Sequence, residues 1–287
     1  MSAGVEVVAV VTNPDRAAGR KLELRASPVK SAAVERGLEI VQPDRVRDPD
    51  FEKVIRQLAP EVCVVVAYGK ILPGSLLEVP PFGFVNVHFS LLPLYRGAAP
   101  VQRALMDGVD ETGISIMVLT EGMDEGPVLA RRSIRVAPEE TAGQLGPRLA
   151  AEGAVLLAEV LPAYVSGELE PLPQDHDRAT YAPKVTADEA RLDWTKSARE
   201  IHNQVRGLNP EPGAWTTFRG KRLKVLRTIP RLSAELEPGL LVEAHPATVA
   251  TGNEAVELVE VQPAGKRVMA GEDFIRGLRP AAGEPFE

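Results

Sequence analysis

The sequence predicts an α/β fold with a Rossmann-like, doubly wound and mainly parallel sheet, followed by a small all-β domain. The first observation is that β-branched runs alternate with helix-like segments over residues 1–167, a pattern typical of parallel sheets. The second is a series of short strand-like segments with Gly and Pro turns over 185–287. These suit a small barrel of the oligonucleotide-binding kind, with a sandwich as the alternative. Residues 168–184 are proline-rich without periodicity and form the expected linker.

The strands and helices of the first domain can be followed in order. Val5–Val11 is a β-branched run that predicts a buried parallel strand. Ser27 caps a helix that has Pro28 at its first position and ends at Gly37. The remaining expected elements are strands over 38–41, 62–67, 114–119 and 128–136, a strand that begins at Phe84, helices over 50–58 and 100–106, and a helix that follows a capping box at Thr141 and ends at Gly167.

The second domain is expected to contain one helix followed by strands. Ser197, with Glu200 three residues later, is the signature of a capped helix start, and Asn209-Pro210 ends that helix. The expected strands cover 214–218, 223–228, 240–243, 248–251 and 256–261.

The most informative stretch covers residues 84–100. It begins as a strand in which Asn86 and His88 point to one face, because strand side chains alternate. Pro93 then ends the strand, and ligands bind at the carboxyl ends of strands in open parallel sheets. There an amide can donate to a developing oxyanion and an imidazole can move a proton. Such residues are more often structural, but the Pro-terminated turn and the loop that follows favour a catalytic role.

A second polar group follows the predicted strand over 114–119. Asp124 lies between Gly122 and Gly126, so its turn can approach another backbone closely. A carboxylate beside His88 would fix the orientation of the imidazole. Spacing therefore makes Asp124 a candidate catalytic residue, although an ordinary Asx turn is the more frequent meaning of such an aspartate.

The composition describes a globular protein and argues against several other classes. Hydrophobic residues make up 44% and charged residues 25% of the chain. The sequence contains no apolar run long enough for a transmembrane helix and no visible signal peptide, so we expect a cytoplasmic location. The single cysteine, Cys63, lies in an apolar run, which fits a buried structural residue. Four histidines without close ligand spacing argue against a metal site.

The net charge of −7 does not indicate nucleic-acid binding, so such a partner would have to meet local basic patches. Two patches are visible. The first contains Arg16, Arg20, Lys21, Arg25 and Lys30, and the second contains Arg219, Lys221, Arg222, Lys224 and Arg227. A solvated surface is the more common meaning of such runs.

Several motifs resemble those of the folate-dependent formyltransferases. The matching segments are those over 13–20, 27–30 and 64–69, Asn86-Val87-His88, Ser90-Leu91-Leu92-Pro93, Arg96-Gly97-Ala98-Ala99-Pro100, the run over 113–126, Thr180-Tyr181-Ala182-Pro183-Lys184 and Gln262-Pro263-Ala264-Gly265-Lys266. The Asn-x-His and Asp elements mark the whole superfamily, whereas the Arg-Gly-Ala-Ala-Pro loop and the C-terminal motifs indicate its branch that acts on methionyl-tRNA. The resemblance runs nearly end to end and implies the formyltransferase fold followed by a barrel.

The resemblance implies transfer of a formyl group from 10-formyltetrahydrofolate to the α-amine of methionyl initiator tRNA, without a metal. Asn86 would stabilise the oxyanion, and His88 coupled to Asp124 would move protons. Ser90, Leu91, Leu92 and Pro93 would lie beside the folate, and the expected tRNA contacts are Arg16, Arg20, Lys21, Lys221, Arg222 and Lys224. The family likeness also favours a monomer.

One segment departs from the family pattern. Members begin with a strand, a Gly-Thr-Pro loop and a helix, whereas only residues 1–4 precede the first strand here. A strand buried on both faces needs neighbours on both edges, so we expect the chain as given to fold poorly or to be inactive. A smaller departure is Thr120, where relatives often carry another acid.

Three alternatives compete with this interpretation. A sister formyltransferase acting on an amino sugar or a purine-precursor amine would keep Asn86, His88 and Asp124 but would not need a basic second domain. A domain that hydrolyses formyltetrahydrofolate would differ mainly in the early basic loop. A non-catalytic tRNA-binding protein would bind tRNA without turnover.

Overall fold

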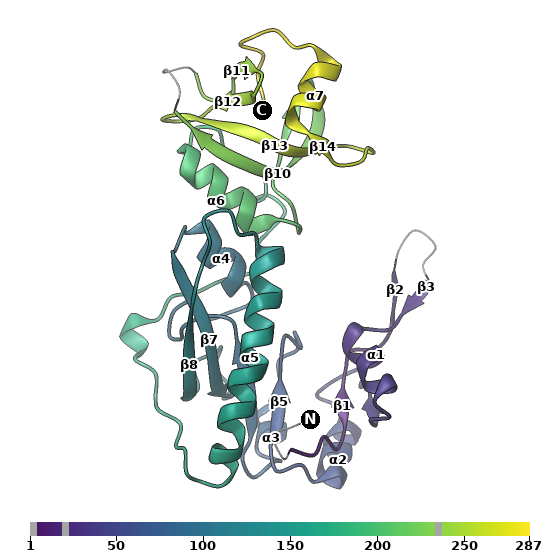
Figure 1. The fold of residues 1–287 in the computed structure, drawn as a ribbon. Helices are drawn as coiled ribbons and strands as arrows, with labels where there is room; N and C mark the ends of the chain where they lie inside the picture. The colour runs from purple at the N-terminus through teal and green to yellow at the C-terminus, as the bar shows by residue number, and fades with distance from the viewer. Residues whose placement is uncertain (1–4, 19–22, 233–236) are drawn as a thin grey trace. The chain divides into compact units, whose positions relative to one another are not determined.

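The computed structural model describes residues 5–18, 23–232 and 237–287 (Figure 1). The chain forms two compact units, each assembled from several segments of the sequence. The first unit contains residues 1–96, 114–132 and 151–179, and the second contains 97–113, 133–150 and 180–287. Strand β7, strand β8 and helix α5 therefore each contribute residues to both units.

The elements follow one another in a mixed α/β order and then in an all-β order. The first part contains β1 (Val10–Val11), β2 (Arg16–Ala18), β3 (Glu23–Arg25), α1 (Pro28–Glu35), β4 (Ile40–Val41), α2 (Pro49–Leu58), β5 (Cys63–Val65), α3 (Gly74–Leu77), β6 (Phe84–His88), α4 (Pro100–Met106), β7 (Glu111–Val118), β8 (Val128–Arg135) and α5 (Ala142–Val165). The second part contains a 3-10 turn (His176–Arg178), α6 (Ala198–Leu208), β9 (Trp215–Phe218), β10 (Lys221–Arg231), β11 (Leu241–Ala244), β12 (Ala247–Ala250), β13 (Ala255–Pro263), β14 (Met269–Ala270) and α7 (Gly271–Leu278).

The first part confirms the predicted α/β class. Strands β1 and β4 pair in parallel, as do β5 and β6, while β7 adds to β6 in the antiparallel sense and β8 follows β7. Figure 1 shows α5 running alongside β7 and β8. Its residue Gly153 lies against the sheet so closely that an added Cβ would come within 2.8 Å of the Val87 side chain. Among the described residues, no helix has both the length and the apolar character needed to cross a membrane.

The predicted buried strand over Val5–Val11 is wrong in its extent. Strand β1 covers only Val10–Val11, and Val5, Val7 and Val8 are each about 40% exposed. The described part of the chain pairs β1 with β4 alone, so one edge of β1 carries no ladder. Because burial of a central strand depends on neighbours at both edges, the apolar pattern of this run does not by itself produce burial.

The predicted helix starts are confirmed by their capping contacts. The Ser27 hydroxyl accepts a hydrogen bond from the Lys30 amide at the start of α1. Ser197 and Glu200 form both halves of a capping box at α6. Several elements were not predicted, namely the hairpin of β2 and β3 within the basic loop, the short helices α3 and α7, and strand β14.

The C-terminal strands form an antiparallel sheet in the order β11-β12-β13-β10-β9, with β14 beside β13. Both edge strands bond to the last residues of the chain. Thr217 of β9 exchanges backbone hydrogen bonds with Glu287, and Leu241 of β11 donates to the carbonyl of Glu284. The terminal segment therefore lies between the two edges and closes the ring of strands. This closure confirms the barrel and removes the sandwich alternative.

An ion pair ties α4 to the segment that follows the proline-rich stretch. The Arg103 guanidinium contacts both carboxylate oxygens of Glu189, at 2.7 and 3.1 Å, and also donates to the Pro183 carbonyl at 3.0 Å. The hydrogen bonds from Arg103, and then that from the Thr186 backbone, lower the pKa of Glu189 from 4.5 to about 2. Bidentate pairing of this kind holds a carboxylate in its charged form.

Glu189→Gln is therefore expected to weaken the fold only where the carboxylate is charged. The pKa of Glu189 is depressed in the folded state, so its contribution is present above pH 4.5 and is lost as the pH falls toward 2. Because Glu189 is 39% exposed, we expect a loss of about 0.2–1 kcal/mol at neutral pH. Urea unfolding measured from pH 7 down to pH 2 checks this. Glu211→Gln is the control, because Glu211 is exposed and has no ion pair among the described residues, and it should leave the pH dependence of the unfolding free energy unchanged. Equal pH dependence in the two variants would contradict the stabilising role of the charged Glu189.

Candidate active site

Strand β6 places the two polar residues singled out by the sequence. Its burial pattern leaves Asn86 partly exposed between buried neighbours, and His88 is only 5% exposed at the end of the strand. Met117 of β7 lies opposite Asn86, and Ser115 lies opposite His88. Within the described residues, no group hydrogen-bonds to the Asn86 amide, so its NH₂ group is available to a ligand.

The His88 imidazole is held from both sides. Its Nε2 atom lies 2.9 Å from the Tyr95 carbonyl oxygen, and its Nδ1 atom lies 3.6 Å from a carboxylate oxygen of Asp124. A carbonyl oxygen only accepts hydrogen bonds, so Nε2 carries the proton of that contact. This leaves Nδ1 as the atom that can gain or lose a proton beside the carboxylate.

The turn that carries Asp124 is pressed against the end of β7. A Cβ at Gly126 would come within 1.9 Å of the Val118 carbonyl oxygen, so only glycine fits there. Asp124 itself has a positive φ of 51°, a conformation that aspartate tolerates better than most residues. The close approach predicted from the glycines is therefore present, and it brings the carboxylate to His88.

The Ser90–Pro93 segment is divided between the interior and the surface. Ser90 is fully buried, with its hydroxyl donating to the Leu94 carbonyl at 2.6 Å, and Leu92 packs among Met117 and Val128. Leu91 and Pro93 remain partly exposed beside the end of β6. The side chains of Leu91 and Pro93, rather than those of Ser90 and Leu92, are thus placed to touch a ligand.

Two buried residues near the site were not indicated by the sequence. The Ser115 hydroxyl donates to the Ser90 carbonyl at 2.7 Å and accepts from the Leu92 amide at 3.0 Å, which fixes the path of this segment. Gln174 contacts the turn of Asp124 from 50 residues away. A serine inside a strand and a glutamine in a proline-rich stretch carry no local signal for such roles.

The first basic patch is described only in part. Arg20 and Lys21 are not among the described residues, and for Arg16 and Arg25 only the backbone strands β2 and β3 are described. Lys30 is described, and its ammonium group contacts Asp15 at 2.7 Å and Gln42 at 2.8 Å.

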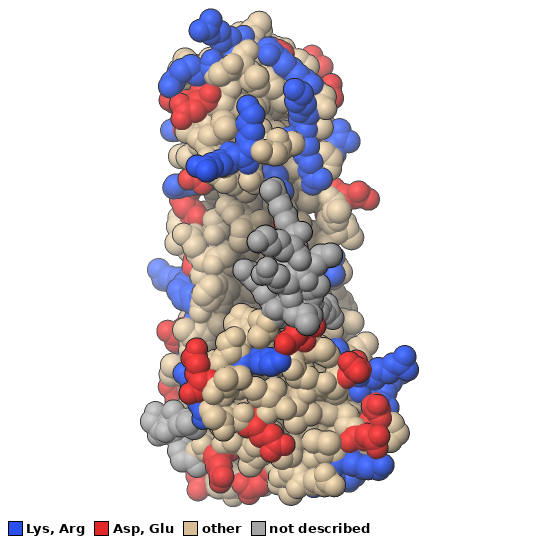
Figure 2. All heavy atoms as spheres, turned by 90° about the vertical axis from the view of Figure 1, so that its right-hand side faces the viewer, with Lys and Arg blue, Asp and Glu red and all other residues tan. Residues whose placement is uncertain are grey.

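Four residues of the second basic patch, Lys221, Arg222, Lys224 and Arg227, lie on β10, where Leu223 and Val225 are buried, and Arg219 precedes this strand. Figure 2 shows Lys and Arg side chains gathered over the face of the C-terminal strands that this view presents. Arg219 is paired with Glu284. Lys221, Arg222 and Lys224 take part in none of the ion pairs among the described residues.

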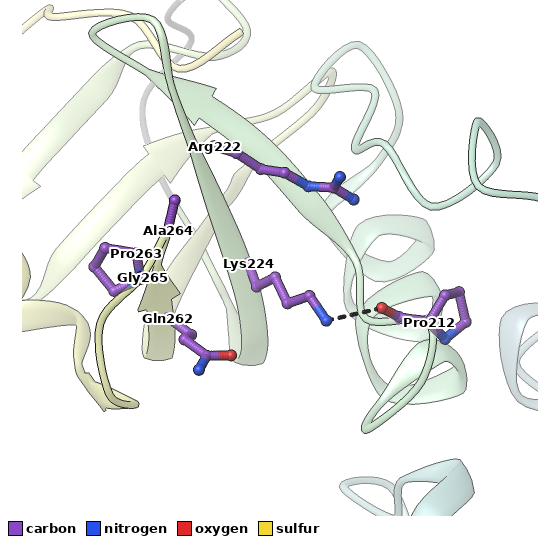
Figure 3. Close-up of a pocket in the computed structure, with 7 residues that line it drawn as sticks. All are labelled: Pro212, Arg222, Lys224, Gln262, Pro263, Ala264 and Gly265. Atoms are coloured by element: carbon purple, nitrogen blue, oxygen red, sulfur yellow. Dashed lines mark hydrogen bonds between the residues drawn. The ribbon is translucent and has the colours of Figure 1, made fainter. Parts of the chain in front are cut away.

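A pocket of about 400 Å³ lies at this patch (Figure 3). It is lined by Pro212, Arg222, Lys224, Gln262, Pro263, Ala264 and Gly265. The Lys224 ammonium donates to the Pro212 carbonyl at 3.1 Å, and the Arg222 guanidinium stacks 4.2 Å from the ring centre of Trp215. The pocket is therefore lined by two cations, one of them stacked on Trp215, and has no acidic lining residue, which suits an anionic ligand.

Other kinds of catalytic group are not assembled here. Burial raises the pKa of the Cys63 thiol to about 11, so this cysteine is not a thiolate nucleophile. Among the described residues, no three His, Cys, Asp or Glu side chains lie close enough together to hold a metal ion.

The chain matches two families along its length. The family described as formyl transferase matches residues 1–161, and the formyl transferase C-terminal domain matches residues 184–279. The methionyl-tRNA formyltransferase of Myxococcus xanthus is 49% identical over 284 residues, which cover 98% of this chain and 91% of the relative. That of Streptomyces coelicolor is also 49% identical, over 97% of this chain and 91% of the relative.

Solved structures share the fold at lower sequence identity. HypX from Aquifex aeolicus in complex with tetrahydrofolic acid has a TM-score of 0.62 and 18% identity, covering 88% of this chain and 45% of that one. The sugar 3N-formyltransferase WlaRD has a TM-score of 0.63 and 15% identity, covering 90% of this chain and 88% of that one. The resemblance noted in the sequence motifs is therefore confirmed, and the chain belongs to the folate-dependent methionyl-tRNA formyltransferase family.

Proposed function

We propose that this chain transfers the formyl group of 10-formyltetrahydrofolate to the α-amine of methionyl initiator tRNA. The observation that carries the proposal is the end of β6, where Asn86 offers a free amide and His88 lies 3.6 Å from the Asp124 carboxylate. Amine, amide and imidazole chemistry of this kind needs neither a metal nor a covalent intermediate. The family membership supports methionyl-tRNA as the acceptor.

In this mechanism 10-formyltetrahydrofolate supplies the formyl group. The bond between the formyl carbon and the folate nitrogen breaks, and a bond to the α-nitrogen of methionine forms. Asn86 donates a hydrogen bond to the formyl oxygen as that oxygen gains negative charge. His88 takes the proton that the amine releases and returns one to the folate nitrogen, through Nδ1, because Nε2 is held by the Tyr95 carbonyl. The Asp124 carboxylate stabilises the imidazolium while it carries the proton.

The two parts of the chain have different roles in this proposal. Residues 1–167 carry out the transfer, with the folate beside Ser90–Pro93, where Leu91 and Pro93 offer exposed apolar surface. Residues 185–287 hold the tRNA, and 168–184 connect the two. The proposal includes a cytoplasmic location and a monomeric chain, both taken from the family likeness.

The test is an acceptor comparison with the purified chain. Labelled 10-formyltetrahydrofolate is mixed with methionyl initiator tRNA, with a nucleotide-linked amino sugar, or with no acceptor. We expect the label to move only to the tRNA. Label transfer to the amino sugar would favour the sister enzyme, release of labelled formate without an acceptor would favour the hydrolase, and tRNA binding without transfer would favour the non-catalytic alternative.

The pocket on β10 provides a separate prediction about tRNA binding. Arg222→Ala and Lys224→Ala should each weaken tRNA binding. Each should also reduce the magnitude of the slope of log K against log salt by about 0.7–0.9, because binding with one phosphate contact fewer releases fewer counterions. Filter binding across a salt series measures this slope. Arg231→Ala is the matched control, because Arg231 lies on the same strand but is paired with Glu257 at 2.9 Å. An equal change of slope in the control would show that the effect is not specific to the pocket.

A further inference from the structure

Gln174 is a buried side chain with a complete set of hydrogen bonds. It is only 5% exposed, and its amide nitrogen donates to the carbonyls of Asp124, at 2.9 Å, and of Gly126, at 2.7 Å. These two carbonyls belong to the turn that brings the Asp124 carboxylate to His88. The bonds span 50 and 48 residues of sequence, so they fix the turn to a distant segment.

Arg96 fixes the orientation of that amide. Its side chain is 2% exposed, and its guanidinium donates to the Gln174 amide oxygen through Nε at 3.1 Å and through Nη2 at 2.8 Å. A guanidinium group only donates and a carbonyl only accepts, so the amide has a single orientation that satisfies both neighbours. The network is therefore directional and runs from Arg96 through Gln174 to the backbone of the Asp124 turn.

The turn that carries Asp124 is strained and partly exposed. Asp124 has a positive φ of 51°, and its neighbours Met123 and Glu125 are exposed. Strained backbone of this kind persists where surrounding contacts determine it. The placement of a proton-handling pair is sensitive to such contacts, since a displacement of about 1 Å can lower a rate by about 100-fold.

We propose that Gln174 is a positioning residue, which holds the Asp124 carboxylate in register with His88 and is itself oriented by Arg96. This inference deepens the proposed function and rests on it. Gln174 touches neither reacting group; it acts through the backbone carbonyls of Asp124 and Gly126. Gln174, which follows α5 in the chain, is thus expected to affect the chemical step rather than substrate binding.

The first test is Gln174→Leu, which nearly keeps the size of the side chain but removes both donated hydrogen bonds and the oxygen that accepts from Arg96. We expect kcat for formyl transfer to fall about 10- to 100-fold, with the KM values for folate and tRNA changed less than about threefold, because positioning acts on the transition state. Gln174→Glu is the second variant. It retains an acceptor for Arg96 but cannot donate to the carbonyls while ionised, so kcat should fall in the same way.

Gln204→Leu is the matched control. Gln204 lies on α6 and is 6% exposed, and its amide nitrogen donates to two backbone carbonyls, those of Glu189 and Arg191. It reproduces the loss of two buried hydrogen bonds without touching the Asp124 turn. We expect it to lower the thermal midpoint and to leave kcat within about twofold.

A double-mutant cycle with Asp124→Ala separates positioning from a general structural role. If Gln174 acts through the Asp124 carboxylate, adding Gln174→Leu to Asp124→Ala should change the residual kcat by less than about twofold, because residues that act as a unit are not additive. The proposal is overturned if Gln174→Leu lowers kcat by the same factor in both backgrounds. It is also overturned if folded Gln174→Leu and Gln174→Glu keep the full kcat, or if Gln204→Leu loses as much.

Hydrogen exchange distinguishes a failure of this inference from a failure of the proposed function. The amides of residues 122–126 should exchange faster in Gln174→Leu than in wild type or Gln204→Leu, whatever reaction the site performs. Unchanged exchange would overturn the positioning role. Faster exchange in a protein that transfers no formyl group to methionyl-tRNA would instead refute the proposed function alone.

Discussion

Asn86→Ala is expected to lower kcat for formyl transfer by about 100- to 1000-fold, the usual cost of removing one oxyanion donor. The physical reason is that the Asn86 amide has no partner among the described residues, so its hydrogen bond is formed only with the reacting group. Removing an interaction that is made only in the transition state lowers kcat without a matching change in KM. Single-turnover transfer to methionyl-tRNA is the measurement.

A matched control is available in the same chain. The side-chain oxygen of Asn253 accepts from the Ala198 amide at the start of α6, so its amide is already used in folding. Asn253→Ala should reduce stability by about 0.5–2 kcal/mol, as expected for a lost helix cap, with kcat unaffected. Near wild-type transfer by folded Asn86→Ala would remove Asn86 from the mechanism.

The same assay should group His88 with Asp124. His88→Ala and Asp124→Ala are each expected to abolish most transfer, and the double variant should be little worse than either one, because the two groups handle one proton. The 3.6 Å separation of the imidazole and the carboxylate is the reason for this expectation. Full additivity of the two losses would mean that they act independently.

Local features of the fold could be predicted from the sequence, because they depend on neighbouring residues. Ser27 and Ser197 each begin a helix with a side-chain cap, and the Gln144 side chain accepts from the Thr141 amide at the start of α5, contacts that a short window of sequence already shows. The extent of β1 could not be predicted, because burial of Val5–Val8 depends on which strands lie at its edges. Closure of the barrel by residues 284–287 likewise depends on contacts far apart along the chain.

The candidate site divides in the same way. Strand alternation put Asn86 and His88 on one face of β6, and no other information was needed. Asp124 was only a candidate by spacing, and the steric fit of Gly126 against Val118 is what brings it to His88. Gln174 reaches the site from 50 residues away, so no pattern within its own segment indicated it.

Phe286→Ala is expected to have the largest effect on stability, about 3–5 kcal/mol. Phe286 is 3% exposed, its ring centre lies 4.5 Å from that of Phe218 and 6.0 Å from that of Trp194, and its amide donates to the Gly239 carbonyl at 2.7 Å. The side chain therefore anchors the segment that joins β9 to β11. Losing it removes core packing and loosens both edges of the barrel, in a domain whose net stability is of the order of 5–15 kcal/mol.

The unfolding of the barrel can be followed by itself. The chain contains two tryptophans, Trp194 and Trp215, and both lie in the C-terminal unit, so urea titration by tryptophan fluorescence reports this unit. Phe286→Leu, which keeps most of the apolar volume, should lose roughly 1–1.5 kcal/mol at most. Formyltetrahydrofolate binding should persist in Phe286→Ala, since the candidate folate residues lie in the other unit, whereas tRNA affinity should fall with the barrel. An unchanged fluorescence midpoint in Phe286→Ala would show that the terminal segment does not hold the ring of strands together.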